Sequence, residues 1–257
     1  SEIPRPAPDI WPVFRRPLAN GASARRKSRF YDIYTLKMTE KLPVNSNKVL
    51  LYGGGGHGKT LLDLLRALGA FEIVGVVDDH LTPGSQVLGV PVLGGADVLP
   101  GLFQSGVRQA VNGVGGIGNV AARLAVFDLL QQAGFTFPTL VHPSAVIEPS
   151  ASLAPGAQIL ALTYVSSAAS IGFGTVLNAG VVVSHDCQLG EVVNLSPGAA
   201  LAGGVRVEDH AQIGMNATVN INLTIGRGAR VGNGATVKAD VPAGGVVRAG
   251  TIWPPRA

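Results

Sequence analysis

The chain has 257 residues, of which 14% are charged and 5% are aromatic, and 35 are glycines. It is long enough for one large domain or two ordinary ones, too apolar for a disordered protein and too rich in glycine for a helical bundle. Its formal charge of +4 comes from residues 1–47, which hold nine Lys or Arg against four Asp or Glu; the other 210 residues hold eleven against twelve. The body of the chain therefore lacks the basic footprint of a nucleic-acid-binding protein, and we expect no such partner.

The sequence predicts neither a membrane anchor nor a secreted protein. No apolar run approaches the roughly 18–20 residues that span a bilayer, and the first residues lack the core of a signal peptide. The single cysteine, Cys187, excludes an intramolecular disulfide and suits a reducing compartment. We therefore expect a cytoplasmic protein without stable membrane insertion.

Residues 1–47 are rich in proline and arginine and show no period. We expect a disordered extension, an expression remnant or an upstream translation artefact, in which case Met38 could be the natural start. The functional alternative is a basic arm that contacts a membrane surface or a partner.

Residues 48–140 read as a compact α/β unit. The expected elements are a buried strand at 48–52, a helix ending at Gly69, a strand at 71–79, a strand at 109–115 and a helix at 119–134. A strand, a glycine loop, a helix and then an acidic pair form the mononucleotide-binding half of a Rossmann-like sheet. In such a unit the glycines admit phosphate to a helix N-terminus, and the acid meets the ribose hydroxyls.

The loop sequence YGGGGHGKT, at 52–60, fits two phosphate-binding patterns. Gly53, Gly58, Lys59 and Thr60 fit the P-loop of ATPases and GTPases, whereas Gly53, Gly55 and Gly58 fit the dinucleotide fingerprint. A P-loop enzyme would also need Mg²⁺ ligands, a water-positioning residue and usually a larger sheet. An NAD-dependent dehydrogenase would need a second half-sheet and a catalytic domain. Neither interpretation fits the second half of the chain.

From Ile147 onward the sequence repeats every six residues without insertion. Val, Ile or Leu occupies every sixth position: Ile147, Leu153, Ile159, Val165, Ile171, Leu177, Val183, Leu189, Leu195, Leu201, Val207, Ile213, Val219, Ile225, Val231 and Val237. A small or β-branched residue precedes most of these by two positions. This pattern predicts a parallel β-helix, in which each hexapeptide supplies a short strand and a corner, with the aliphatic residue inside. By the same period Cys187 faces inward as a packing residue.

A GxxGHG loop in a small Rossmann-like domain, followed by hexapeptide repeats, resembles the hexapeptide-repeat nucleotide-sugar acetyltransferases. This branch contains bacterial UDP-4-amino-sugar and GDP-perosamine N-acetyltransferases and sialic-acid O-acetyltransferases. The resemblance covers about residues 48–256. It implies a Rossmann-like nucleotide-sugar-binding domain at 48–140, a left-handed β-helix at 141–241 and a capping segment at 242–257. It also implies a homotrimer with acetyl-CoA in the clefts between neighbouring subunits.

The resemblance implies that His185 is the general base, because the His185-Asp186 pair falls at the repeat where the family carries it. A neutral imidazole suits proton acceptance from the attacking sugar nitrogen or oxygen, and Asp186 would fix the tautomer or favour the imidazolium. Cys187 as a covalent nucleophile is the weaker alternative. Family members often carry a second histidine nine residues after the base, where this chain has Asn194. His210 is expected to be a surface turn residue.

The remaining site residues are carried over by matching positions. The nucleotide sugar is expected at Gly55, Gly56, His57, Asp78, Asp79 and Gly115. Coenzyme A is expected at Asn194, Gly203, Gly204, Gly214, Met215, Gly232 and Asn233.

The expected function is acetyl-CoA-dependent N-acetylation of a nucleotide-linked 4-amino-4,6-dideoxy sugar, either a UDP-amino sugar or GDP-perosamine, for surface polysaccharide or protein glycosylation. The alternative is O-acetylation of sialic acid or a related sugar. A noncatalytic β-helix scaffold and a carbonic-anhydrase-like metal enzyme are further alternatives; the metal enzyme would need three histidine ligands across subunits. We expect no metal.

Overall fold

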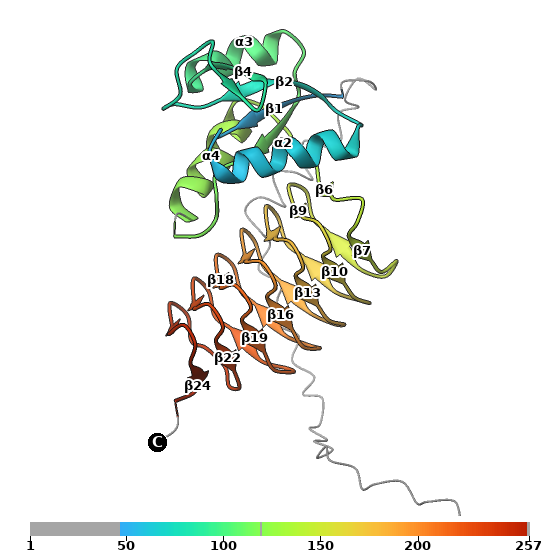
Figure 1. The fold of residues 1–257 in the computed structure, drawn as a ribbon, viewed down its shortest axis with the longest axis vertical. Helices are drawn as coiled ribbons and strands as arrows, with labels where there is room; N and C mark the ends of the chain where they lie inside the picture. The colour runs from blue at the N-terminus through green and yellow to red at the C-terminus, as the bar shows by residue number, and fades with distance from the viewer. Residues whose placement is uncertain (1–46, 119, 256–257) are drawn as a thin grey trace, which may run out of the picture.

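The computed structural model describes residues 47–118 and 120–255, which form an α/β domain and a β-helix (Figure 1). The expectations for the basic extension fall outside the described residues, apart from residue 47. None of the helices that the described residues form is long and apolar enough to cross a bilayer.

The α/β domain is built on a five-stranded sheet of order β3-β4-β2-β1-β5, parallel except for the β3–β4 pair. Its strands are β1 (Lys48–Tyr52), β2 (Glu72–Val77), β3 (Gln86–Val87), β4 (Val90–Gly94) and β5 (Gln109–Asn112). Its helices are α2 (Gly56–Leu68), η1 (Ala96–Val98), α3 (Leu99–Gln104) and α4 (Val120–Gln132). The three strands and two helices expected from the sequence are all present. The elements β3, β4, η1 and α3 were not expected; they are short and lie between the second and third predicted strands.

Helix α2 begins within the glycine loop, four residues before the expected start. Gly55 precedes the first turn, and Lys59 N donates to Gly55 O at 3.0 Å. The helix ends as expected at Gly69, whose φ of 61° is left-handed and suits a residue without a side chain. The loop after β1 therefore leads directly into the first turn of a helix, whose free N–H groups point toward the loop.

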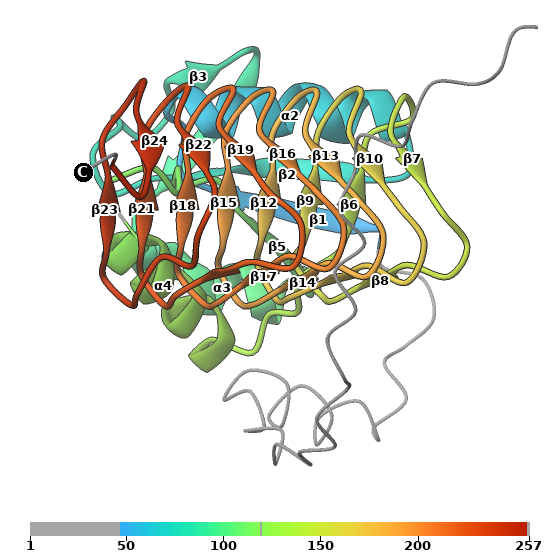
Figure 2. The same ribbon diagram turned by 90° about the horizontal axis from the view of Figure 1, so that it is seen from below.

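The second domain is a left-handed parallel β-helix in which the chain returns to the same sheet every 18 residues. For example, Val165 pairs with Val183 on one side and Ile147 on the other. Its two-residue strands are β6 (Leu140–Val141), β7 (Val146–Ile147), β8 (Ser152–Leu153), β9 (Gln158–Ile159), β10 (Tyr164–Val165), β11 (Ser170–Ile171), β12 (Val176–Leu177), β13 (Val182–Val183), β14 (Gln188–Leu189), β15 (Asn194–Leu195), β16 (Ala200–Leu201), β17 (Arg206–Val207), β18 (Gln212–Ile213), β19 (Thr218–Val219), β20 (Thr224–Ile225), β21 (Arg230–Val231), β22 (Thr236–Val237), β23 (Val246–Val247) and β24 (Ile252–Trp253). The stacked coils are seen in Figure 2, with the α/β domain behind them.

The sixteen predicted aliphatic positions are the second residues of β7 to β22, and they form the core of the β-helix with the small residues two positions earlier. Leu195 is completely buried, as are Ala199 and Ala211. The repeat begins one hexapeptide before the predicted start, with Val141 in β6. Strands β23 and β24, within 242–257, extend two of the sheets by pairing with β21 and β22.

Three sheets form the sides of the β-helix. We call them the docking sheet (β23-β21-β18-β15-β12-β9-β6), the apolar sheet (β24-β22-β19-β16-β13-β10-β7) and the polar sheet (β20-β17-β14-β11-β8). Each coil passes from the apolar to the polar and then to the docking sheet. The α/β domain lies against the docking sheet (Figure 1).

Side chains from both domains meet at this junction. His57 Nε2 lies 2.8 Å from Gln158 Oε1 of β9, and Gly118 N donates to Gln212 Oε1 of β18 at 3.2 Å. At one edge of the junction, the ring of Phe127 in α4 packs against that of Phe173 in the β-helix, with centroids 4.9 Å apart. The apolar contact and the hydrogen bonds together fix the loops after β1 and β5 over the docking sheet.

Candidate active site

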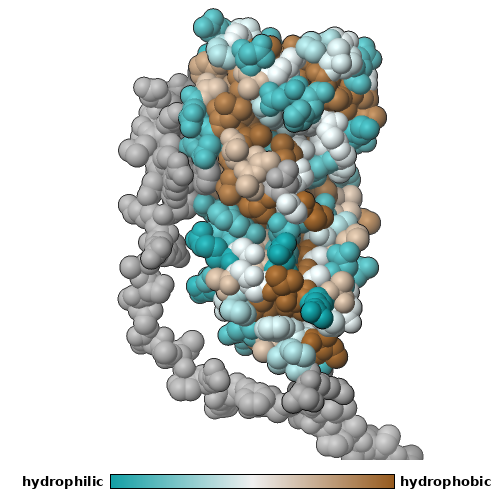
Figure 3. Space-filling model, turned by 90° about the vertical axis from the view of Figure 1, so that its left-hand side faces the viewer, coloured by the Kyte–Doolittle hydropathy of each residue, from teal (hydrophilic) through white to brown (hydrophobic). Residues whose placement is uncertain are grey.

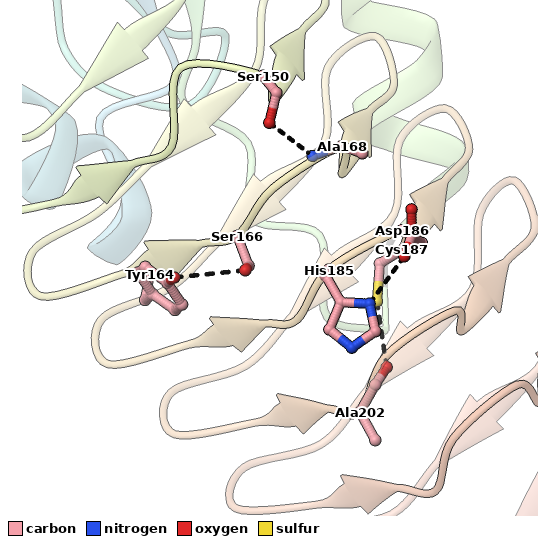
Figure 4. Close-up of polar contacts among 8 residues, drawn as sticks. All are labelled: Ser150, Tyr164, Ser166, Ala168, His185, Asp186, Cys187 and Ala202. Atoms are coloured by element: carbon pink, nitrogen blue, oxygen red, sulfur yellow. Dashed lines mark hydrogen bonds and ion pairs between the residues drawn. The ribbon is translucent and has the colours of Figure 1, made fainter.

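His185 and Asp186 lie at the corner between β13 and β14, on the outside of the β-helix (Figure 4). His185 Nδ1 is 2.7 Å from Asp186 Oδ2, and the two side chains are 60% and 66% exposed. A carboxylate accepts a hydrogen bond, so this contact places the imidazole proton on Nδ1 and leaves the Nε2 lone pair free. The pair has the arrangement of an oriented general base.

The next coil makes room for the imidazole. A Cβ added at Gly203 would lie 2.5 Å from His185 Cε1 and 2.6 Å from Nε2. Any side chain at this position would displace the ring. Gly203 thus lies directly against the His185 ring. Gly204 lies beside it, and its N–H donates to His185 O at 2.9 Å.

Cys187 points into the β-helix, as the period predicted. Its side chain is completely buried, and Sγ lies 3.2 Å from Ala202 O (Figure 4). Burial raises the pKa of the Cys187 thiol, so the reactive thiolate is disfavoured. The structure therefore supports a packing role.

The glycine loop follows β1 and is held tightly against the neighbouring loop after β5. Gly53 N donates to Val77 O at 2.8 Å, and a Cβ on Gly58 would lie 2.0 Å from Gly53 O. A Cβ on Gly113 would lie 2.5 Å from the same oxygen. Glycine is required at these positions by close backbone approach, which is the packing role of the last glycine in a dinucleotide fingerprint. A Cβ on Gly55 or Gly56 would meet no other atom within 4 Å, so these two positions are open to solvent.

The two carboxylates at the end of β2 are engaged within the protein. Asp78 accepts hydrogen bonds from Gly54 N at 2.7 Å and His80 N at 2.9 Å. Asp79 accepts from the Tyr52 hydroxyl and from Ala96 N, and the Tyr52 hydrogen bond is the largest cause of the lowered pKa of Asp79. These bonds hold the two carboxylates in place, and each carboxylate oxygen retains a second lone pair for a further hydrogen bond.

His57 reaches across the domain junction rather than into open solvent. Gln158 Nε2 donates to Asn112 O at 2.9 Å, so Gln158 Oε1 must accept from His57 Nε2–H. Burial, followed by the charge of Arg123, lowers the pKa of His57 to about 4. His57 is therefore neutral at physiological pH and weakly basic.

A groove of about 480 Å³ runs along the last coils of the docking sheet and the corner beyond it. It is lined by four of the residues expected to bind coenzyme A, Gly214, Met215, Gly232 and Asn233. Asn233 Oδ1 accepts from Met215 N at 2.9 Å, which joins neighbouring corners along the groove. Figure 3 looks onto the C-terminal coils and the domain junction, where apolar side chains gather.

Asn194 lies deeper than this groove. It is 3% exposed, and its Nδ2 lies 3.4 Å from Ser196 Oγ. A side chain at Gly116 would come within 3.0 Å of Asn194 Oδ1, so the loop after β5 covers this amide. Asn194 thus supports the floor of the junction.

The described chain does not bring the predicted site residues into one place. The loops after β1 and β5 lie over the docking sheet, and the groove follows the corner between the docking and apolar sheets. His185 and Gly203 lie at the corner between the apolar and polar sheets, on the side of the β-helix opposite the docking sheet. His210 lies at the third corner, between β17 and β18. Within the described residues, no three His, Cys, Asp or Glu side chains are grouped as a metal site.

Two residues at the junction were not expected from the sequence. Arg123 is buried in α4 and donates to three backbone carbonyls, and Ile117, 65% exposed, lines the groove from the α/β domain. An arginine in an apolar helical run was the available signal for Arg123. Neither residue matches a motif, because each acts through contacts between segments far apart in sequence.

Comparison with known proteins places the chain among sugar-modifying enzymes. Residues 48–130 match a family model described as the PglD N-terminal domain. A histidine-to-asparagine variant of perosamine N-acetyltransferase from Caulobacter crescentus, in complex with CoA and GDP-perosamine, is 34% identical with a TM-score of 0.74; the match covers 81% of this chain and 96% of that one.

Two further structures match over a similar length. The acetyltransferase domain of PglB from Neisseria gonorrhoeae is 34% identical with a TM-score of 0.73, over 79% of this chain and 96% of that one. WeeI from Acinetobacter baumannii is 29% identical with a TM-score of 0.70, over 77% and 94% of the two chains. These proteins span both domains described above.

Proposed function

Because the chain belongs to the hexapeptide-repeat nucleotide-sugar acetyltransferases, we propose that it acetylates the amino group of a nucleotide-linked 4-amino-4,6-dideoxy sugar, with acetyl-CoA as the donor. The observation that carries the proposal is the exposed His185-Asp186 pair with its free Nε2. The similarity to a perosamine N-acetyltransferase bound to CoA and GDP-perosamine supports the choice of donor and acceptor class. UDP-linked and GDP-linked sugars both remain candidates.

The proposed reaction is a direct acyl transfer. The neutral sugar amine attacks the thioester carbonyl carbon, and a tetrahedral intermediate forms. His185 Nε2 accepts a proton from the sugar nitrogen, the carbon–sulfur bond breaks, and the coenzyme A thiolate leaves and takes up a proton. His185 can supply this proton, which returns the imidazole to its neutral form.

Asp186 orients the base in this mechanism. Its carboxylate holds Nδ1–H at 2.7 Å, so the lone pair of Nε2 faces away from the corner. The negative charge also stabilises the imidazolium that forms when the base accepts its proton. No covalent acyl-enzyme is required, which agrees with the burial of Cys187.

The proposed substrate cavity lies between the loop after β1 and the loop after β5. Gly55, Gly56 and Gly115 would border the diphosphate, and Asp78 and Asp79 the base or ribose. Open space at Gly55 and Gly56 supports this placement, as does the adjacent N-terminus of helix α2. Coenzyme A would occupy the groove along Met215 and Asn233.

The proposed assembly is a homotrimer in which neighbouring subunits complete each site. In one chain His185 lies on the far side of the β-helix from the substrate loops, so a second copy must bring them together. The apolar sheet supports a contact of this kind, because Val146, Val182 and Ile252 on its outer face are 55%, 38% and 42% exposed. A head-to-tail contact that closes after three copies would form the trimer.

Thiol release from acetyl-CoA tests the proposal. The wild-type protein is offered UDP-linked and GDP-linked 4-amino sugars and free sialic acid in parallel, and the product is examined by mass spectrometry. Turnover with a nucleotide-linked amino sugar, with one acetyl group added to its nitrogen, is the expected result. Turnover only with sialic acid would replace the proposal with O-acetylation, and no turnover by a folded trimer would refute it.

A further inference from the structure

Arg123 is a buried cation that neither the sequence motifs nor the proposed reaction explains. It is 1% exposed in helix α4, and none of the ion pairs formed by the described residues includes it. Burial of a guanidinium without a counter-charge costs free energy, so the charge of Arg123 does not by itself stabilise the fold. Its partners point to another role.

The guanidinium of Arg123 donates to backbone carbonyls from both domains. Nη1 donates to Val114 O at 2.6 Å and to Asn112 O at 3.2 Å, and Nη2 donates to Gly174 O in the β-helix at 3.0 Å. The Val114 carbonyl belongs to the loop after β5, and the Asn112 carbonyl to the last residue of that strand. Arg123 therefore fixes the start of that loop and ties it to the β-helix.

The same bonds set the direction of one peptide group in the loop. In a trans peptide the N–H points away from the C=O, so the Val114 carbonyl on Arg123 turns the N–H of Gly115 to the opposite side. Gly115 N makes no hydrogen bond to any described residue. Gly115 lies beside the substrate loop, since a Cβ on it would be 3.8 Å from His57 Cβ. This peptide thus presents a free donor next to the proposed diphosphate position.

The positive charge of Arg123 acts on His57, at the start of helix α2. Desolvation lowers the pKa of Arg123 to about 9, so the guanidinium stays protonated at neutral pH. The pKa of His57 is lowered first by burial and then by this charge. A positive charge with no carboxylate partner therefore acts on the same loops that would hold an anion.

We propose that Arg123 is a positioning residue that selects a diphosphate-bearing ligand, by aiming the Gly115 N–H at a phosphate oxygen and by placing an uncompensated positive charge behind the loop. The inference rests on the proposed nucleotide-sugar substrate and adds the residue that recognises its charged part. Arg123 touches no substrate atom in this account, since the peptide of Val114 and Gly115 lies between them.

Titration calorimetry with UDP, GDP, uridine and guanosine tests the inference. We expect Arg123→Met and Arg123→Gln to weaken binding of the preferred diphosphate about tenfold or more, as the loss of one weakly screened charge implies, and to change nucleoside binding less than about twofold. Arg123→Lys keeps the charge and should retain the preference for diphosphate within about threefold. A purely structural role would weaken both ligand classes alike.

Arg108→Met is the matched control. Arg108 also lies over a phenylalanine ring and donates to backbone carbonyls of its own domain, but it precedes β5, whereas the loop follows that strand. This variant should keep the preference for diphosphate over nucleoside.

The outcomes separate this inference from the proposed function. Wild-type protein that binds neither UDP nor GDP would refute the proposed substrate class together with the inference. Diphosphate binding that is unchanged in the neutral Arg123 variants would overturn the inference alone. If neither neutral variant folds, loss of the preference in a folded Arg123→Lys protein would overturn it.

Discussion

At the scale of single residues, the proposed chemistry depends on a carboxylate that orients an imidazole. Asp186→Asn replaces the acceptor for His185 Nδ1–H with an amide that can present its NH₂ group instead. The tautomer with the proton on Nε2 would then be favoured, and the base would lose its lone pair at the reacting end. We expect kcat to fall about tenfold to a hundredfold with little change in either KM.

Asp63→Asn is the control for this prediction, because Asp63 is an exposed residue of α2 that pairs with Arg66 on the same helix. It should leave kcat unchanged. An Asp186→Asn enzyme with wild-type kcat would show that the carboxylate does not orient the base.

The buried His57 predicts a pH dependence of stability. Its pKa is lowered from 6.5 to about 4 by burial and then by Arg123, so between these values the unfolded chain binds more protons than the folded protein. Stability contributed by neutral His57 is therefore present above pH 6.5 and is lost as the pH falls toward 4, by about 3 kcal/mol in all. Chemical denaturation of wild type and His57→Gln across this range measures the effect as a difference.

The comparison with His57→Gln is needed because the shifted pKa of Glu191 changes stability with pH in the opposite direction. Burial first, and then the charge of Asp209, raises the pKa of Glu191 to about 7, so the folded protein binds more protons than the unfolded chain between pH 4.5 and 7. The stability it contributes is lost as the pH rises through 7. Wild type and His57→Gln both contain Glu191, so its contribution cancels in the difference between their stabilities. A pH-independent difference would contradict the buried, neutral state of His57.

At the scale of elements, the corner of one coil shapes the site on its neighbour. Gly203→Ala places a methyl group 2.5 Å from the present position of His185 Cε1, and Gly203 does not have a left-handed φ that would strain alanine. We expect the ring to be displaced and kcat/KM to fall about tenfold or more, since small misplacement of a reacting group is costly. The melting temperature should change little.

Gly101→Ala in α3 serves as the comparison, because a Cβ there would meet nothing within 4 Å. Wild-type kcat/KM in Gly203→Ala would mean that His185 does not react from this position. A large loss of melting temperature would instead show that the corner itself cannot accept a methyl group.

Much of the β-helix could be predicted because its physics is local and periodic. An aliphatic residue at Val183 must face inward whenever its neighbours six and eighteen residues away do, so the period reveals both the strand and its direction. The three strands and two helices of the α/β domain were predictable for the same reason. Strand β3 has only two residues, too few for a period, and Pro91 interrupts the sequence of β4.

The site was less predictable because its details are set by contacts across long separations. Asp78 and Asp79 were expected to meet a ligand, and the sequence did not indicate that Gly54 N and Tyr52 would hold them. The contact of His57 with Gln158 spans 101 residues. Arg123 belongs to no sequence motif. Its partners are backbone carbonyls, which every residue carries, so the sequence does not show which of them it contacts.

At the scale of the whole molecule, the proposed trimer predicts that the apolar sheet is covered. Val182→Arg puts a charge on the outer face of that sheet, where the side chain is 38% exposed in one chain. Because burial of an unpaired guanidinium in an interface is costly, we expect dissociation to monomers and loss of acetyl transfer, with the β-helix still folded. Light scattering and circular dichroism measure the two properties.

Gln188→Arg on the polar sheet is the matched control and should remain a trimer with wild-type activity. A wild-type protein that is monomeric and active would refute the shared site, because one chain holds His185 away from its own loops after β1 and β5, where the substrate is proposed to bind.

The central claim is that His185 takes the proton from the sugar nitrogen. Single-turnover acetyl transfer by His185→Gln, at saturating acetyl-CoA and acceptor, tests it most directly, with acetyl-CoA binding measured separately. The proposed mechanism predicts a rate lowered about a hundredfold or more, which is the size of a lost general base, and acetyl-CoA affinity within about threefold of wild type. A His185→Gln rate within about threefold of wild type would contradict this mechanism and would mean that another group accepts the proton.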